Sequence, residues 1–308
     1  MPPDDHRPRA SSFVNDGSDA PPRLEVHQAW WAMTGIGDGG REWSFEEKLE
    51  RIAGAGFTGV FAIPPAPEDE RRWSRALEQH GLSLGLAAFP RERGQLAAFM
   101  ELAAALGTSY VTSQVAGPLL GDVEAVALLE ALVEEAGAAG IPHFVETHRG
   151  RVTQDLVRTA DYLEAIPDLR LTVDLSHYVV AGEISLVRLE LSGGEIDAAF
   201  EPVLRRASAI HGRVSNGEQV QIDVGAEGEH PMVAHFARWW RRAMERFREQ
   251  GCAGDVLPFV CELGPPPYAV TDGVDGRELS DRWKQSLVLK RVAEDAWRDV
   301  RAAAQEPA

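Results

Sequence analysis

The sequence predicts a single (β/α)8 barrel, and three observations indicate it. Short apolar, β-branched runs alternate with stretches that repeat their apolar residues at helical spacing. Eight such runs can be counted, and the roughly 25 to 50 residues from one run to the next leave room for a helical crossover. No linker-like change in composition interrupts residues 23–300. A doubly wound open sheet is the alternative arrangement of the same units.

The elements follow in order along the chain. The helix after the first strand is expected to begin at Ser44, because Ser44 and Glu47 have capping-box spacing. Two longer loops, residues 215–230 and 264–278, follow the last two strands and are expected at the C-terminal mouth of the barrel. The expected strands are residues 24–29, 57–63, 82–89, 108–114, 142–147, 169–175, 209–214 and 257–263. Two further helices are expected from the one-sided sets Leu96, Phe99, Met100, Ala103, Leu106 and Val233, Phe236, Trp240, Ala243, Phe247.

Composition excludes several classes of protein. The 308 residues include 48 acidic and 31 basic side chains, a formal net charge of −17. Binding to a nucleic acid requires clustered positive charge, so no nucleic-acid partner is expected. The 44% hydrophobic and 26% charged residues are close to globular averages, and the chain can therefore bury a sizeable core.

The ends of the predicted domain and its cellular setting follow from local composition. Residues 1–22 are rich in Pro, Asp, Arg and Ser, and they are expected to form a disordered tail before a domain at residues 23–308. The two cysteines are too few for a disulfide framework, which favours a reducing compartment. No apolar run reaches the roughly 18 residues that span a membrane. A cytoplasmic protein without a membrane partner is expected.

The few lysines exclude other enzyme classes. Lys48, Lys284 and Lys290 all lie in charged, helix-like stretches, whereas a Schiff-base aldolase needs a lysine in its pocket. The sequence also lacks a P-loop and a Gly-x-Gly-x-x-Gly fingerprint after a strand. Kinase, P-loop ATPase and Rossmann dehydrogenase functions are therefore not expected.

Four of the strand runs end in a residue that can bind a metal ion. Glu146 lies in VETH, Asp174 in VDLSH, His211 in AIHGRV and Glu262 in VCELG. Acidic side chains at neighbouring strand ends would meet near the barrel axis and repel one another, and a divalent cation relieves that repulsion. Each residue alone could instead be a helix cap, a salt-bridge partner or a buried histidine. Together they predict one divalent ion per chain, with Mn²⁺ preferred and Mg²⁺, Co²⁺ or Zn²⁺ as alternatives.

The same four motifs, VETH, DLSH, HGR and CELG, resemble the strand-end motifs of the xylose isomerase-like TIM barrel superfamily. That superfamily contains sugar and sugar-phosphate isomerases and epimerases, inosose dehydratase-like lyases and endonuclease IV. The resemblance implies that Glu146, Asp174, His211 and Glu262 are the metal ligands. It also implies a substrate-contacting or metal-binding position at His177. The strand-two and strand-three histidines of endonuclease IV are missing here, and this argues against DNA repair.

Other residues at the mouth are candidates for binding substrate. Arg213 has the strand parity of His211 and His148 that of Glu146, so both are expected to point into the pocket. For Arg213 the alternative is a salt bridge to an acidic ligand. The alternative for His148 is a supporting contact to the metal ligands. Trp30 and Trp31 close the first strand, where their rings suit either a sugar face or core packing.

Two arginines follow the fifth strand. Arg149 and Arg151 lie just beyond VETH and are interpreted as ordinary loop charges.

These residues predict an isomerase or epimerase that acts on a ketose, keto-sugar or related polyol through an enediolate. The metal would acidify a C–H next to a carbonyl. The resemblance to the epimerases of this superfamily implies that Glu146 and Glu262 are the acid/base pair. A lyase or dehydratase on a 3-keto-sugar, keto-inositol or glycoside is the alternative, with His177 or His148 as proton donor. A barrel subunit that binds a sugar or a partner without turnover is the non-enzymatic alternative. The partner expected is a small sugar or polyol, and a homo-oligomer is left open.

Overall fold

A closed parallel barrel forms the centre of the computed structural model, which describes residues 12–303. Neighbouring strands pair in parallel from β2 round to β11, and β11 pairs back with β2 over Val256↔Arg23 to Cys261↔Gln28. This last pairing closes the barrel and excludes the open sheet. The eight barrel strands in the described residues are β2 (Arg23–Ala29), β5 (Gly59–Ala62), β6 (Ser83–Ala88), β7 (Tyr110–Ser113), β8 (His143–Glu146), β9 (Leu171–Val173), β10 (Ala207–Gly212) and β11 (Asp255–Cys261).

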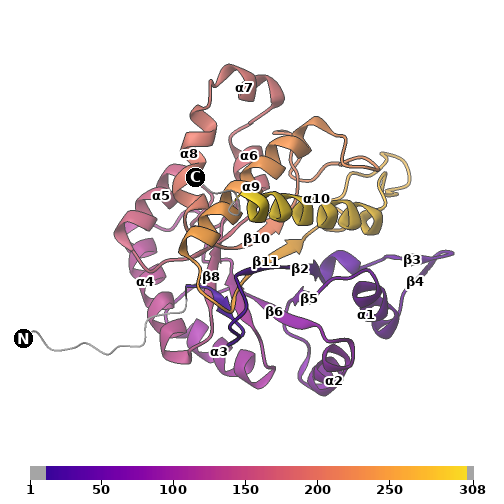
Figure 1. Ribbon diagram of the computed structural model, residues 1–308, viewed down its shortest axis with the longest axis horizontal. Coiled ribbons are helices and arrows are strands. Elements are labelled where there is room, and N and C mark those ends of the chain that lie inside the picture. The colour runs from indigo at the N-terminus through magenta and orange to yellow at the C-terminus, as the bar shows by residue number, and fades with distance from the viewer. Residues whose placement is uncertain (1–11, 304–308) are drawn as a thin grey trace, which may run out of the picture.

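Helices surround the strands (Figure 1). The first begins where the capping box predicted, since the Ser44 hydroxyl accepts from the Glu47 N–H at 3.3 Å and the Ser44 N–H donates to the Glu47 carboxylate at 2.7 Å. The helices are α1 (Phe45–Gly54), α2 (Glu70–His80), α3 (Gln95–Ala105), α4 (Asp122–Ala139), α5 (Leu156–Ala165), α6 (Leu175–Ala181), α7 (Leu186–Leu191), α8 (Glu195–Leu204), α9 (Pro231–Gln250) and α10 (Arg282–Ala303), with short turns η1 (Trp31–Met33) and η2 (Pro67–Asp69).

Two features interrupt the regular alternation of strands and helices. A small hairpin of β3 (Gly37–Asp38) and β4 (Arg41–Glu42) precedes α1 and extends away from the barrel at the right of Figure 1. Between β9 and β10 the chain forms three helices, α6 to α8, and α7 projects at the top of the view.

Among residues 12–303, none of the helices combines the length and the apolar character that crossing a membrane requires.

The interior of the barrel is filled by a layer of aromatic side chains. The ring of Tyr110 stacks with those of Phe61 and Phe144, at centroid distances of 6.1 and 6.0 Å. A Cβ on Gly85 would lie 2.4 Å from the Tyr110 ring, so this ring position requires glycine on the next strand. Because side chains alternate along a strand, Phe144 on β8 places Glu146 on the same inward face. The aromatic layer therefore lies directly below the strand ends that carry the polar residues.

The N-terminal segment differs from the expected tail. Residues 1–11 of that prediction lie outside the described residues, but residues 12–22 are part of the fold. Here β1 (Val14–Asn15) pairs antiparallel with the start of β11, and Phe13 is buried against Phe247 at a centroid distance of 4.9 Å. For these residues the prediction of disorder is replaced by a short strand. The Phe13 ring, the β1 pairing and the hydrogen bonds of Asn15 to Ala253 and Asp255 hold the segment in place. A two-residue strand is too short to show a periodic pattern in the sequence.

Candidate metal centre

Four polar side chains meet at the C-terminal ends of consecutive strands. Glu146 ends β8, Asp174 follows β9, His211 lies on β10 and Glu262 follows β11. One potential ligand atom from each lies within 4.8 Å of the others. All four side chains are buried, with at most 5% of any of these residues exposed. Parallel strands bring their C-terminal ends to the same rim, which explains why residues so distant in sequence converge.

In each of the three carboxylates, one oxygen accepts a hydrogen bond from the protein and the other does not. Glu146 accepts a hydrogen bond at Oε2 from the Gln114 side-chain amide at 3.0 Å, and Glu262 accepts one at Oε1 from the Trp31 indole N–H at 3.1 Å. Asp174 accepts at Oδ1 from the Ser176 N–H at 2.9 Å and from its hydroxyl at 2.5 Å. Among the described residues, the other oxygen of each carboxylate is buried without a hydrogen-bond partner.

His211 lies among these unpaired oxygens. Its Nδ1 atom is 2.7 Å from Glu262 Oε2 and 3.5 Å from Glu146 Oε1. In the described part of the chain, neither contact has the angles of a hydrogen bond, and both ring nitrogens are buried without a partner. Buried polar atoms are rarely left in this state. A set of three carboxylate oxygens and one imidazole nitrogen without partners fits a hard divalent cation.

Burial and charged neighbours shift the pKa values of three of these four residues. Burial alone would lower the pKa of His211, but the carboxylates of Glu262 and Glu146 raise it to about 10. Burial raises the pKa of Asp174 to about 6, although Arg213 opposes this. Burial would also raise the pKa of Glu262, but His211 and Arg213 lower it to about 2. A divalent ion needs the neutral imidazole, and it would therefore take the place of the His211 proton.

Arg213 also faces this group. Its Nη2 atom is 3.0 Å from Glu262 Oε2 and 3.8 Å from Asp174 Oδ2, while Nε donates to the Glu262 carbonyl at 3.0 Å. The two interpretations of Arg213, pocket residue and salt-bridge partner, are therefore both found. It lines a cavity of about 270 Å³ above the four-residue group. The other lining residues are Trp31, Phe61, Ala62, Ile63, Ala87, Phe89, Gln114, His148, Arg151, Glu262 and Tyr268.

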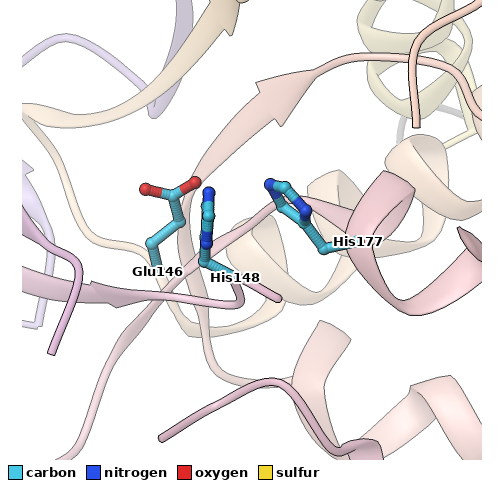
Figure 2. Close-up of side chains that lie close together, drawn as sticks. All are labelled: Glu146, His148 and His177. Atoms are coloured by element: carbon cyan, nitrogen blue, oxygen red, sulfur yellow. The ribbon is translucent and has the colours of Figure 1, made fainter. Parts of the chain in front are cut away.

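His148 and His177 lie beside Glu146, and Figure 2 shows the three side chains next to one another. One potential ligand atom from each lies within 4.8 Å of the others. The His148 and His177 rings are 3.9 Å apart between centroids. Among the described residues, both nitrogens of the buried His177 lack a hydrogen-bond partner. Burial lowers the pKa of His177, as do His148 and Arg213, and burial lowers that of His148. Both rings are therefore neutral at pH 7.

The two remaining candidates, Trp30 and Trp31, lie in different surroundings. Trp31 lines the cavity, as expected, but Trp30 does not, and its ring packs against Phe45 and Trp73 at 5.3 and 4.8 Å. The core-packing interpretation therefore describes Trp30, whereas Trp31 lies at the cavity. Neighbouring residues at a strand end point in different directions, so only one of the pair faces the cavity.

Three residues of the site were missed by sequence reasoning. Gln114 holds Glu146, and Arg151 donates to the Gln114 Oε1 atom from Nε and Nη2 at 3.3 and 3.1 Å. Arg151 therefore lines the cavity and is more than an ordinary loop charge. Tyr268, from the loop after β11, packs edge-on against Trp31 at 5.4 Å. For Gln114 a signal existed, because it ends the fourth strand run.

Comparison with known proteins identifies the fold family. The family described as "Xylose isomerase-like TIM barrel" matches residues 49–219. No curated protein matches the chain. Among solved structures, an L-ribulose 3-epimerase is 15% identical over 92% of this chain and 100% of its own, with a TM-score of 0.58.

Two further structures have similar folds. A xylose isomerase-like TIM barrel protein from Mycobacterium smegmatis, solved in complex with magnesium, is 12% identical over 92% of this chain and 98% of its own, with a TM-score of 0.55. The probable 3-DHS dehydratase AsbF from Bacillus anthracis is 13% identical over 86% and 97%, with a TM-score of 0.54. At such identities these likenesses show the fold alone. Together with the family match over more than half of the residues, they establish that this chain belongs to the xylose isomerase-like TIM barrel family.

Proposed function

We propose that the protein is a divalent-metal-dependent isomerase or epimerase that acts on a ketose, keto-sugar or related polyol. The observation that carries this proposal is the shared pattern of the three carboxylates. Each turns one oxygen to a protein donor and leaves the other buried without a hydrogen bond, close to His211 or Arg213. Mn²⁺ or Mg²⁺ suits such an oxygen-rich set. The net charge of −17 argues against a nucleic-acid substrate.

The ion is assigned to Glu146, Asp174, His211 and Glu262 and not to the neighbouring group of Glu146, His148 and His177. The first group supplies three carboxylates and the second only one, which both groups share. Two divalent ions would bring four positive charges next to three carboxylates and Arg213, leaving two charges uncompensated. One ion together with Arg213 balances the three carboxylates.

Each residue of the proposed centre would have its own role in the proton transfer. A bound divalent ion supplies Lewis acidity, which makes the C–H next to a substrate carbonyl easier to deprotonate. Glu146 at the end of β8 and Glu262 after β11 approach the centre from different strands, and their carboxylates would take and return the proton. Gln114 and Trp31 fix the orientation of these two carboxylates through their other oxygens. Burial of all four ligand residues excludes water from the reacting atoms.

A lyase or dehydratase reaction is the second candidate, and His148 and His177 favour it. Both are neutral imidazoles, packed at 3.9 Å, next to Glu146. His148 donates from Nδ1 to the Arg149 carbonyl in this tautomer, which leaves Nε2 as a proton acceptor. Once protonated by the substrate, such a pair could return the proton to a leaving group. Elimination changes the mass of the substrate, whereas isomerisation does not.

Deuterium exchange tests the proposed reaction. Mn²⁺-loaded protein is incubated in D₂O with a panel of ketoses and cyclic hydroxy-ketones, and NMR follows the C–H next to the carbonyl. Wild-type protein should exchange this hydrogen, and Glu146→Gln should abolish exchange because the amide cannot take a proton. Glu134→Gln, which changes an exposed glutamate on α4, is the matched control and should exchange normally. Exchange by Glu146→Gln at the wild-type rate would remove Glu146 from the mechanism.

A further inference from the structure

We propose that the groove between α8 and α9 binds the phosphate group of a small molecule, at a site separate from the metal centre. The groove is a cavity of about 560 Å³ between two of the helices that surround the barrel, against about 270 Å³ at the metal centre. The inference does not depend on the proposed function. It rests on five arginines that line the groove, which are Arg205, Arg238, Arg241, Arg242 and Arg246.

Four of these arginines lie on one side of α9. Arg238, Arg242 and Arg246 follow one another at intervals of four residues, and Arg241 comes three residues after Arg238. Side chains at these spacings are neighbours on a helix, and like charges there destabilise it. The side chains of Arg238, Arg241 and Arg242 are half-exposed, so packing does not require them. The helix therefore concentrates positive charge that it does not need for its own stability.

The carboxylates of the groove do not balance this charge. Among the described residues, the lining has five guanidinium groups against the three carboxylates of Asp197, Glu201 and Glu245, an excess of two positive charges in a chain whose net charge is −17. One carboxylate serves three of the arginines. Glu201 accepts hydrogen bonds at 2.9, 3.1 and 2.7 Å from the Nε atoms of Arg205, Arg242 and Arg246.

Arg241 and Arg242 have donors left for a ligand. Glu245 lies 3.5 Å from Arg241 Nε and 3.6 Å from Arg242 Nη1, and neither contact is a hydrogen bond. Within residues 12–303, Arg241 forms no hydrogen bond at all. Each guanidinium group offers five N–H donors in a planar fork, which matches two oxygens of a phosphate. These two arginines are therefore the expected contacts of the ligand.

The size and the charge of the groove indicate the class of ligand. A volume of about 560 Å³ lies within the usual range for small-molecule sites. A phosphate monoester carries a charge of about −1.5 to −2 at neutral pH, which compensates the excess of two positive charges. Arginines on neighbouring turns are about 5–6 Å apart at Cβ, so two of them can bind the oxygens of one phosphate.

Calorimetric titration with inorganic pyrophosphate tests the site. The protein is first stripped of divalent ions with EDTA and dialysed, so that no metal ion can bind the probe. Wild-type protein should bind one pyrophosphate per chain, and the affinity should fall as NaCl is added. The midpoint of thermal unfolding should rise with the concentration of pyrophosphate, because the ligand binds the folded chain.

Two double variants separate the groove from general charge. Arg241→Gln, Arg242→Gln should bind pyrophosphate at least about tenfold more weakly than wild type, since charge-assisted hydrogen bonds are lost. Glu201 keeps two of its three arginine partners in this variant, so the fold should stand. Arg71→Gln, Arg75→Gln removes the same charge from exposed positions of α2 and should bind within about twofold of wild type.

A single variant should change the affinity in the opposite direction. Glu245→Gln removes the carboxylate that competes for Arg241 and Arg242, and it should bind pyrophosphate at least about threefold more tightly. Glu134→Gln removes an exposed carboxylate from α4 and should leave the affinity unchanged.

Three outcomes would overturn the inference. The first is the absence of saturable pyrophosphate binding by folded wild-type protein. The second is equal weakening in the two double variants, because long-range charge alone would then explain the effect. The third is tighter binding of a hexaglutamate peptide than of pyrophosphate, which would indicate an acidic protein partner instead. None of these outcomes bears on the metal centre, since the protein is free of metal throughout.

Discussion

Replacing Gln114 by leucine removes the side chain that orients Glu146. The Gln114 amide donates to Glu146 Oε2 at 3.0 Å, and Glu146 is 2% exposed, so water cannot easily take over this bond. Hydrogen bonds to charged groups contribute about 1.5–3 kcal/mol, and a loss of this size corresponds to about a 10- to 100-fold weaker metal affinity. Leucine has nearly the volume of glutamine, so the change is electrostatic rather than steric.

Titration calorimetry with Mn²⁺ measures this effect. Gln114→Leu is compared with Gln154→Leu, which makes the same replacement in the loop after β8, where the Gln154 side chain accepts from the Gly150 N–H. The control should bind Mn²⁺ within about twofold of wild type, because its contact involves no metal ligand. Urea unfolding in the presence of EDTA reports any loss of fold stability separately. If Gln114→Leu also binds Mn²⁺ within about twofold of wild type, the reasoning about the carboxylates is refuted.

Three further predictions concern other parts of the molecule. Trp31→Phe removes the N–H that holds Glu262 Oε1 and should weaken Mn²⁺ binding by about 3- to 30-fold; unchanged calorimetric affinity would contradict this. Burial lowers the pKa of His143 to about 3, so the folded state stays neutral while the unfolded state binds a proton below about pH 6.5. Between pH 7 and pH 5 the wild-type protein should therefore lose about 2 kcal/mol more unfolding free energy than His143→Gln. An equal loss in the two proteins, measured by urea unfolding, would contradict this prediction. Phe13→Ala should cost about 3 kcal/mol in the same assay because Phe13 is 6% exposed, and a cost under about 1 kcal/mol would show that the segment is loosely held.

The barrel and the convergence of Glu146, Asp174, His211 and Glu262 at one rim could be predicted because they follow from local patterns. Each strand is a short apolar run, and alternation along it decides which residues face inward. Phe144 and Glu146 share a face for this reason, and so do Ala209 and His211. Strand ends in a closed parallel barrel share one rim, so their convergence needs no further information once the strand count is known.

The parts that were missed depend on contacts that no local pattern encodes. Gln114 follows a strand, much as Glu146 ends one. An amide is a weak metal ligand, so the residue type alone did not mark Gln114 as a candidate. Arg151 and Tyr268 lie in loops, whose courses follow from tertiary packing rather than from periodicity. Trp30 was assigned to the mouth with Trp31, although parity alone could have separated the two. Phe13 anchors a two-residue strand, too short for any period to appear.

The central claim is that Glu146, Asp174, His211 and Glu262 together hold one divalent ion. Equilibrium dialysis of tag-free protein against Mn²⁺ tests it most directly, comparing wild type with a Glu146→Gln, Glu262→Gln double variant whose fold is verified by circular dichroism. The account predicts one bound ion per wild-type chain and none in the double variant. No saturable binding in wild type, or equal binding in both proteins, would contradict the account and leave the barrel as a binding protein without a metal centre at this rim.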